Sequence, residues 1–592
     1  RTMVGYYDTD MLNIVFPMLL LWSIIWAIDT KKNIYLIFTA LDVLAYRWWY
    51  PQSYALEFAF WGMLVLYLLY LLYQNKTPLG KYYENSDIAY TIQLLSIMML
   101  AMIDLDMLFR IILVLGYLML FTQKRWYKYL HIIFLMVVVL FLATGGFDPI
   151  WGKLKAYVFT EHISINSEGL KLNFFTVMQT VREASQITFV TFANRISGHT
   201  IIFLLSFVGY LVLLYRHKIM LLSLPMVGLG FLALSGGLRF TIYAVPIFAL
   251  GMGYFIYEAS KFLSKQFKNK IASKVSYYVL LALFTSGVLY PNIKHVIAYK
   301  VPTALQNTEV RVLDKLKTIA NREDYVVSWW DYGYPLRYYS DIKTLSDGGK
   351  HSGSVNFPSS YTLTNSQETA SKMLRFDVEY TEKRFAVNEN NKELNQNDTN
   401  YIKWASSNIE QMTVEYEYDD TNDFLIALET NIKLPAKSRD IYLFLPNRMM
   451  PLVPTIELFS NLNLMDGTKG RQSHFYRTTK FKKTKNMIDL QNGIKFYKQD
   501  GYVEMGGRKL KVNNFVETQY DSKGKLKTKI QSINTEGQVN VIYMKNYHTF
   551  LVLNDKLFNS TYIQLFVLEN YNQKLFEPII LTPRSKVYKL KI

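Results

Sequence analysis

The motif WWDYG at residues 329–333 has the side chains for recognising a small hydroxyl-bearing group. Two adjacent indole rings form a rigid wall with N–H donors, and Asp331 adds a hydrogen-bond acceptor at its edge. An apolar, strand-like stretch over 325–327 leads into the motif, and Gly333 and Pro335 signal a turn after it. The pattern places the motif at the end of an element, as a binding site or as a buried aromatic corner with a capping Asp.

Two further acids, Asp8 and Asp10, lie directly before the first long apolar segment. Carboxylates this close repel each other and favour a divalent cation that takes hard oxygen ligands, such as Mg²⁺ or Mn²⁺. The long segment 145–199 offers Glu183 as a third carboxylate and Arg195 as a partner for an acidic group. All four residues would also be ordinary in solvated loops, so spacing alone leaves both interpretations open.

Arg239 lies at the start of another apolar segment, after Gly236 and Gly237. A charge at the edge of a membrane span is costly and marks a functional site by default. A phosphate group is a natural partner for its guanidinium group. The alternative is an arginine that extends along the interface to reach water.

The elements that must position these residues begin with a hydrophobic N-terminal half. The 592 residues are 51% hydrophobic and include no Cys, which excludes disulfides, thiolate zinc sites and a Cys nucleophile. Apolar runs long enough, or nearly so, to cross a bilayer recur about ten times. We place these runs at 11–28, 34–46, 55–73, 88–103, 105–121, 130–144, 200–215, 219–234, 238–258 and 276–292.

The net charge of +18 is distributed unevenly over the loops between these runs. Alternate loops are rich in Lys and Arg, such as those around 124–128 and 261–274, while the others carry little beyond Arg47 and Arg239. By the positive-inside rule the basic loops are cytoplasmic, so the charge is a topology and membrane-surface signal and not a nucleic-acid footprint. Ten crossings then place Asp8, the 145–199 loop and the C-terminal half on one external side.

The C-terminal half has a mixed α/β pattern without internal repeats. We expect helices at 303–320, 366–376 and 402–413, a loop at 384–400, and strands such as 539–543 and 563–567. The predicted domains are a transmembrane domain over 1–292, an external α/β domain with WWDYG over 293–499, and a β-rich subdomain over 500–592.

The motifs together resemble the catalytic subunit family of oligosaccharyltransferases, in particular its bacterial single-subunit PglB type. The resemblance rests on WWDYG, the Asp-x-Asp pair before a span, the TVRE segment at 180–183 and LRFTIYAVP at 238–246. It implies a GT-C type multispan glycosyltransferase with an external mixed α/β domain and a β-rich C-terminal part. It also implies transfer of a glycan from a polyprenyl diphosphate carrier to the Asn amide of Asn-x-Ser/Thr, with Mn²⁺ or Mg²⁺.

The resemblance further implies partners and a location. The partners would be the lipid-linked oligosaccharide, an acceptor polypeptide and the bilayer, with no nucleic acid and a monomeric chain. The location would be a bacterial inner membrane, with the active site on the periplasmic side. From the chemistry we expect a single in-line displacement that inverts the anomeric carbon, because the sequence shows no nucleophile for a covalent intermediate.

Site roles carry over from the family position by position. Asp8 and Glu183 would be catalytic and would bind the metal together with Asp10, and Glu183 would also hold the acceptor amide. The sequon would be bound by Trp329, Trp330 and Asp331 at its hydroxyl, by Met449 and Leu452, and by Arg195 at an acidic residue two positions before the Asn. Leu452 replaces the family's usual Ile. The lipid diphosphate or its first sugar would be near Arg239, Arg1, Tyr157, His351 and Tyr334.

One departure concerns the start of the chain. The family has another metal-binding Asp upstream of anything in this sequence, and the chain begins at Arg1 without a signal peptide. We therefore expect that N-terminal sequence is missing. Two other classes stay open: a polyprenyl-phosphate-dependent multispan glycosyltransferase that acts on lipid or glycan, and a non-enzymatic membrane receptor or transporter without metal dependence. The first class gives no reason for WWDYG, and in the second the aromatic patch would bind a ligand. Neither accounts for several motifs on one face as economically.

Overall fold

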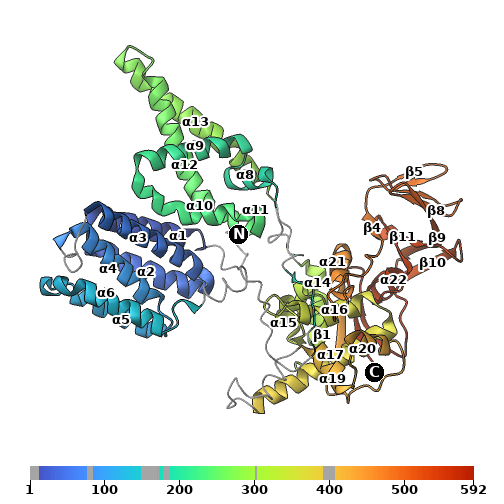
Figure 1. The fold of residues 1–592 in the computed structure, drawn as a ribbon. Helices are drawn as coiled ribbons and strands as arrows, with labels where there is room; N and C mark the ends of the chain where they lie inside the picture. The colour runs from blue at the N-terminus through green and yellow to red at the C-terminus, as the bar shows by residue number, and fades with distance from the viewer. Residues whose placement is uncertain are drawn as a thin grey trace. The chain divides into compact units, whose positions relative to one another are not determined.

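The structure is a computed structural model that describes residues 12–75, 84–148, 170, 172–177, 180, 187–299, 303, 305–390 and 407–592 (Figure 1). The chain divides into two compact units. Unit 1 comprises Arg1–Ile163 and Val181–Val301, and unit 2 comprises Ser164–Thr180 and Pro302–Ile592. Each unit is described by itself.

Unit 1 is helical, coloured blue to green in Figure 1. All ten predicted apolar runs coincide with helical segments wherever the structure describes them, because uninterrupted apolar sequence satisfies its backbone most readily as helix. Helix α4 is buried from Ile88 to Met102 and forms the middle of the first group of helices. The main helices are α1 (Val15–Thr30), α2 (Asn33–Trp49), α3 (Tyr54–Asn75), α4 (Ser86–Met102), α5 (Met107–Leu120), α6 (Leu130–Ala143), α8 (Phe189–Ser197), α9 (Thr200–Arg216), α10 (Leu224–Phe231), α11 (Ala233–Gly236), α12 (Thr241–Ser264) and α13 (Lys270–Ala298).

Several of these helices suit a bilayer. Among the described residues, five are long and apolar enough to cross a membrane, namely Pro51–Asn75, Arg125–Ala143, Lys218–Gly236, Leu238–Ser264 and Lys270–Ala298. The pair Phe189–Ser197 and Thr200–Arg216, bent by 72°, would make a sixth as one span. Three shorter apolar helices, α1, α4 and α5, accompany them. The chain is therefore a multi-pass membrane protein, while the count of ten spans stays a prediction.

Unit 2 is built on a central sheet with the strand order β13-β14-β3-β1-β2 in the described residues. The parallel strands are β1 (Tyr325–Val327), β2 (Lys343–Thr344) and β3 (Ile441–Pro446), and β14 (Ser585–Leu590) pairs antiparallel with β3. Strands β1 and β3 are buried throughout, as expected for apolar strands inside an α/β unit. The remaining elements are β13 (Phe576–Leu581) and helices α14 (Asn307–Lys317), α15 (Gly333–Ser340), α16 (Gly353–Thr364), α17 (Gln367–Asn390), α19 (Asn408–Glu415), α20 (Thr421–Ala427) and α21 (Val453–Ser460).

A second sheet follows the central one in sequence and contains nine strands where the chain is described. We call 475–553 the β lobe. Its strands are β4 (Phe475–Thr478), β5 (Lys482–Lys483), β6 (Ile488–Asp489), β7 (Lys495–Tyr497), β8 (Tyr502–Met505), β9 (Arg508–Tyr520), β10 (Leu526–Ser532), β11 (Val539–Met544) and β12 (Thr549–Leu553). Its first and last strands, β4 and β12, pair antiparallel. The chain then passes through α22 (Asp555–Phe558) and rejoins the central sheet at β13 and β14.

Comparison with the sequence-based expectations is mostly favourable in unit 2. The strand before WWDYG is β1, the strand at 539–543 is β11, and the three expected helices correspond to α14, α17 and α19. The strand expected at 563–567 is wrong: these residues form the helical segment η11 (Ile563–Val567), buried on every side. A short apolar run without alternation does not distinguish a buried helix from a buried strand. The loop expected at 384–400 is also wrong over 384–390, where α17 continues, and 391–400 lies outside the described residues.

Candidate functional site

The predicted site residues of unit 2 gather where the three parallel strands end. WWDYG follows β1, the segment Asn447–Leu452 follows β3, and the loop 346–351 follows β2. Because β1 pairs in parallel with both β2 and β3, the carboxyl ends of all three lie at one edge of the sheet. Open α/β sheets place their ligand sites at this edge.

Trp329 forms the buried part of this edge. Its side chain is 2% exposed and meets Phe459 of α21 edge-on, with 5.2 Å between ring centroids. The preceding Ser328 Oγ donates a hydrogen bond of 2.9 Å to the Phe444 carbonyl oxygen in β3. Met449 is fully buried as well. These contacts make Trp329 part of the hydrophobic core, as the buried-corner interpretation of the motif proposed.

Trp330 lies in a different environment. Its ring is half-buried and stacks on His351, with 4.7 Å between centroids and 20° between planes. Trp330 Nε1 and His351 Nδ1 are buried, and neither has a hydrogen-bond partner in the described part of the chain. Buried polar atoms are nearly always partnered, so these two atoms on stacked rings mark a place where water or a polar ligand group would complete the arrangement.

Gly333 explains how the loop 346–351 comes so close. A Cβ atom at this position would lie 2.3 Å from the carbonyl oxygen of Ser346 and 2.4 Å from Cβ of Asp347, so any larger residue would push the loop away. Next to it, Tyr334 is 55% exposed and lies against Gly348 and Gly349, where an added Cβ would contact its ring and hydroxyl at 2.6 and 2.8 Å. The glycines at 333, 348 and 349 therefore allow the loop 346–351 and the WWDYG motif to approach each other closely.

Asp347 fixes the conformation of this loop. Its buried carboxylate accepts hydrogen bonds from Arg337 Nη1 at 2.9 Å and from the backbone N–H groups of Gly349 and Lys350 at 2.8 and 2.9 Å. Burial alone would raise the pKa of Asp347, but these donors together lower it below the ordinary value. The charged carboxylate thus organises the turn that brings His351 onto Trp330.

Asp331 is the acceptor at the exposed rim. Desolvation by the neighbouring protein raises the pKa of Asp331, and the positive charges of Arg448 and His351 offset part of this effect. Leu452, in the segment after β3, is half-buried. The edge therefore combines an acceptor, an indole donor and an apolar surface, which suits a short side chain with a hydroxyl group.

The remaining predicted site residues lie in unit 1 or outside the described residues. Arg195 is exposed on α8, and Arg239 is exposed in the short helix Leu238–Phe240 with its guanidinium 5.2 Å from the Phe240 ring centroid, both in unit 1. Arg1, Asp8, Asp10, Tyr157 and Glu183 lie outside the described residues. In the ranges that the structure describes, no group of three or more acids and histidines is arranged to hold a metal.

Three participants at the edge were missed from the sequence. Asp347 follows a strand and precedes two glycines, a turn signal that could have identified it. Arg448 is next to Met449 and could have been included with that segment. Phe459 carries no local signal, because its role depends on the packing of α21 against Trp329.

Comparisons with known proteins cover the whole chain. Residues 1–297 match the family model of the N-terminal part of oligosaccharyl transferase STT3, residues 322–466 match the STT3/PglB/AglB core domain, and residues 474–553 match the STT3/PglB C-terminal β-barrel domain. An undecaprenyl-diphosphooligosaccharide–protein glycotransferase of Campylobacter jejuni is 37% identical over 600 residues, which cover 100% of this chain and 80% of that protein.

Solved structures give further similarities. The crystal structure of the C. jejuni PglB C-terminal domain is 36% identical, with 48% of this chain and 100% of that chain covered and a TM-score of 0.41. A crystal structure of the Archaeoglobus fulgidus oligosaccharyltransferase, tethered to an acceptor peptide with an NVT sequon, is 11% identical, covers 98% of this chain and 62% of that chain, and has a TM-score of 0.48.

Proposed function

This chain belongs to the STT3/PglB family of oligosaccharyltransferases, glycosyltransferases that move an oligosaccharide onto protein, and we propose that it recognises Asn-x-Ser/Thr through the edge of its central sheet. The donor is an undecaprenyl-type polyprenyl diphosphate carrying the oligosaccharide, as in the name of the C. jejuni relative. The acceptor is the side-chain amide nitrogen of Asn.

The observation that carries the proposal is the pairing of a partnerless indole N–H with a rim carboxylate. A Ser or Thr hydroxyl both donates and accepts a hydrogen bond. It would donate to Asp331 and accept from Trp330 Nε1, which has no partner in the described residues. Leu452 would pack against the methyl group of Thr, and Arg195 would pair with an acidic residue two positions before the Asn.

The transfer itself needs an activated amide and a stabilised leaving group. The amide nitrogen attacks the anomeric carbon, the C–N bond forms as the bond from carbon to the diphosphate oxygen breaks, and the nitrogen loses one proton. The configuration at carbon is inverted in this single displacement. Glu183 would hold the amide N–H groups in position, and Arg239 would bind the diphosphate as negative charge grows on it. Arg1, Tyr157, His351 and Tyr334 would contact the donor.

A divalent metal completes the proposal. The family resemblance implies a divalent metal, and the three acids Asp8, Asp10 and Glu183 are hard oxygen donors of the kind that Mn²⁺ and Mg²⁺ prefer. These acids lie outside the described residues, so their fit is judged by donor chemistry alone. When bound, the metal supplies electrostatic stabilisation of the departing diphosphate. The positive-inside pattern of the basic loops supports a periplasmic position for this chemistry, at a bacterial inner membrane.

Peptide glycosylation by the purified protein in detergent tests the proposal. A fluorescent peptide with Asp-x-Asn-x-Thr is offered with polyprenyl-diphosphate oligosaccharide and Mn²⁺, with and without EDTA. We expect a metal-dependent mass gain of the peptide. The rate of glycosylation should fall roughly 10- to 100-fold in Asp331→Ala, because a hydrogen bond to a charged group contributes about 1.5–3 kcal/mol. Asp314→Ala removes an exposed carboxylate of α14 and serves as the matched control. Transfer to lipid or glycan without transfer to peptide would contradict the proposal.

A further inference from the structure

Helix α21 holds the buried part of the sequon edge in place. It continues directly from the segment Asn447–Leu452, and its Phe459 packs on Trp329 and on Phe175, each with 5.2 Å between ring centroids. A displacement of α21 would therefore move the apolar wall of the edge, and whatever fixes α21 influences how the acceptor is held.

One residue of α21 does not fit its apolar surroundings. Glu457 is 1% exposed, in a helix whose other buried residues are Val453, Ile456 and Phe459. A buried carboxylate is costly unless hydrogen bonds and a counter-charge satisfy it. A carboxylate at this position therefore needs partners from other elements.

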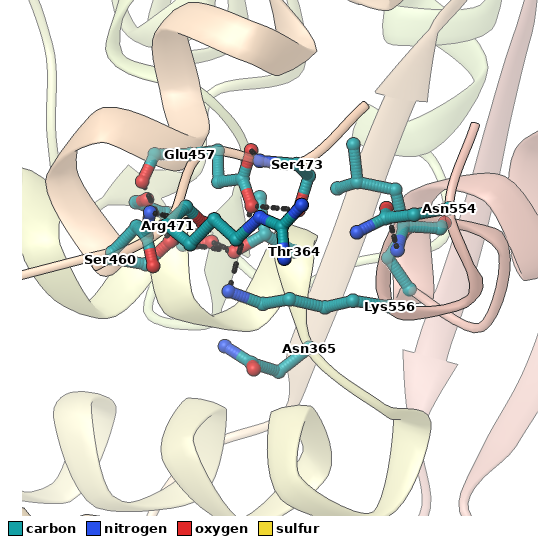
Figure 2. A network of polar contacts seen from close by, with 12 residues as sticks. Thr364, Asn365, Glu457, Ser460, Arg471, Ser473, Asn554 and Lys556 are labelled. Atoms are coloured by element: carbon teal, nitrogen blue, oxygen red, sulfur yellow. Dashed lines mark hydrogen bonds and ion pairs between the residues drawn. The ribbon is translucent and has the colours of Figure 1, made fainter. Parts of the chain in front are cut away.

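The partners come from both ends of the β lobe (Figure 2). Ser473, just before β4, donates a short hydrogen bond from Oγ to Glu457 Oε1 and a second one of 3.4 Å from its backbone N–H to Oε2. Lys556 in α22, just after β12, places its Nζ 3.5 Å from Glu457 Oε1. One carboxylate thus contacts the segment that leads into the lobe and the segment that leaves it.

These two segments are also joined to each other. The backbone N–H of Asn554 donates a hydrogen bond of 3.1 Å to the carbonyl oxygen of His474, next to the pairing of β12 with β4. Residues 473–474 and 554–556 therefore form a neck, by which we mean the connection between the β lobe and the part of unit 2 that contains the central sheet. Glu457 belongs to that part of unit 2 and contacts the neck.

Helix α21 is also tied to α16, the helix that begins just after His351. Ser360 Oγ donates to the Ile456 carbonyl oxygen at 2.5 Å, and the hydroxyl groups of Thr364 and Ser460 lie 2.7 Å apart. Helices α16 and α21 thus form one block that carries both the His351 end and the Met449 end of the edge. The Glu457 contacts fix this block to the neck (Figure 2).

We propose that Glu457 and Lys556 are a positioning pair through which the β lobe braces the acceptor site. The inference rests on the proposed function, because it assigns this pair to the binding of the Asn-x-Ser/Thr peptide. Neither side chain belongs to WWDYG or to the segment Asn447–Leu452, so the pair acts through α21. Loss of the Lys556 charge leaves the Glu457 carboxylate buried with hydrogen bonds, among the described residues, from Ser473 alone. This loosens α21 and weakens the peptide-binding edge without changing the chemical step.

The first experiment compares Lys556→Met with wild type in the full protein. Methionine keeps the aliphatic stem and removes the charge. We expect the KM for the sequon peptide, and its Kd by fluorescence anisotropy, to rise roughly fivefold, with kcat and the KM for the lipid-linked donor within about twofold. Lys556→Arg should restore peptide affinity. Lys523→Met, an exposed lysine of the β lobe, is the matched control and should change nothing.

A second measurement separates positioning from simple loss of fold. Amide hydrogen exchange over 453–460 should be faster in Lys556→Met than in wild type, while exchange over the lobe strand β11, residues 539–544, stays the same. In a double-mutant cycle, Glu457→Gln and Lys556→Met together should cost less than the sum of the two single effects.

The contrary results are distinguishable. Unchanged peptide affinity in Lys556→Met, or unchanged exchange in α21, would overturn the positioning role alone. A drop in kcat at constant KM would show a smaller folded fraction and would also overturn it. If the wild-type protein itself does not bind the sequon peptide, the proposed function fails together with this inference, and the exchange measurement still reports whether the pair fixes α21.

Discussion

The two tryptophans of WWDYG are adjacent in sequence but differ in burial and in their contacts. Trp329 is enclosed by Phe459 and has become part of the core, whereas Trp330 is half-buried, stacked on His351 and next to the exposed Asp331. One motif therefore contains an anchor and a recognition surface. The lesson is that a conspicuous motif need not be entirely functional or entirely structural, because neighbouring residues can divide the two tasks.

Alanine substitutions of the two tryptophans should give the largest difference between the two positions. Removing a fully buried Trp costs about 3–5 kcal/mol, so Trp329→Ala should lower the unfolding transition strongly and reduce activity through loss of folded protein. Trp330→Ala should lower stability by less than about 2 kcal/mol and abolish sequon binding in protein that is still folded. Thermal unfolding followed by intrinsic fluorescence, together with peptide anisotropy, distinguishes the two. Equal destabilisation would contradict the division of tasks.

Gly333→Ala tests the contact between the WWDYG motif and the loop 346–351. The added Cβ would lie 2.3 Å from the Ser346 carbonyl oxygen, so the loop 346–351 must shift. Overpacking of this kind costs about 1–3 kcal/mol, and His351 should move off Trp330. We expect weaker peptide binding and a lower melting temperature. Gly493→Ala, where an added Cβ meets nothing within 4 Å but φ is +77°, separates backbone strain from steric overlap.

The pH dependence should separate recognition from stability. Because the pKa of Asp331 is raised, this carboxylate becomes protonated at a higher pH than an ordinary Asp as the pH falls, so peptide binding should weaken first. The lowered pKa of Asp347 means that its contribution to stability is complete above the unfolded-state value near 3.8 and is lost only below it. Peptide affinity and the free energy of unfolding are each measured from pH 7 to pH 3. Peptide affinity should decline first as the pH falls, and stability second. The Asp331→Asn protein should bind weakly at every pH and lack the first decline. Simultaneous declines in the wild type would contradict the assignment.

Leu452→Ile should give the smallest effect. The half-buried Leu452 side chain is expected at the Thr methyl group, and exchanging Leu for Ile keeps volume while moving one branch. The ratio of kcat/KM for Asn-x-Thr over Asn-x-Ser peptides should change by less than about fivefold, since a misplaced methylene is worth about 1 kcal/mol or little more. Competition between the two peptides in one reaction measures this ratio directly. A loss of activity on both peptides would instead indicate that Leu452 supports the fold.

Local patterns predicted the elements well and their meeting points poorly. The apolar runs of unit 1, the strand before WWDYG and the strand at 539–543 follow from composition and periodicity. The stacking of His351 on Trp330 depends on β2 lying beside β1, and the contact of Phe459 with Trp329 depends on α21 crossing the edge. Such contacts join residues that are distant in sequence and leave no periodic signal.

The site was anticipated unevenly for the same reason. Trp330, Asp331, Tyr334 and His351 were named from the motif and the family resemblance, and the structure brings them to one edge. Met449 was expected to contact the acceptor, and the structure buries it completely. The metal ligands Asp8, Asp10 and Glu183 stay predictions, as do the donor contacts of Arg239, Arg1 and Tyr157.

The neck of the β lobe has a consequence for how this architecture can vary. Phe475 and Leu553 face each other in the pairing of β4 with β12, so the lobe begins and ends at neighbouring positions. Cross-strand neighbours in an antiparallel pair are only about 5 Å apart between Cα atoms. A lobe attached in this way can be exchanged, enlarged or shortened without a change in the strand order of the central sheet, which we call the host. The host sheet is completed by β13 and β14 after the chain returns from the lobe. A lobe of different origin would meet the same host lysine, Lys556, which follows β12 in α22, and would have to replace contacts such as the hydrogen bond of 3.3 Å from Thr528 Oγ1 to the Leu568 carbonyl oxygen.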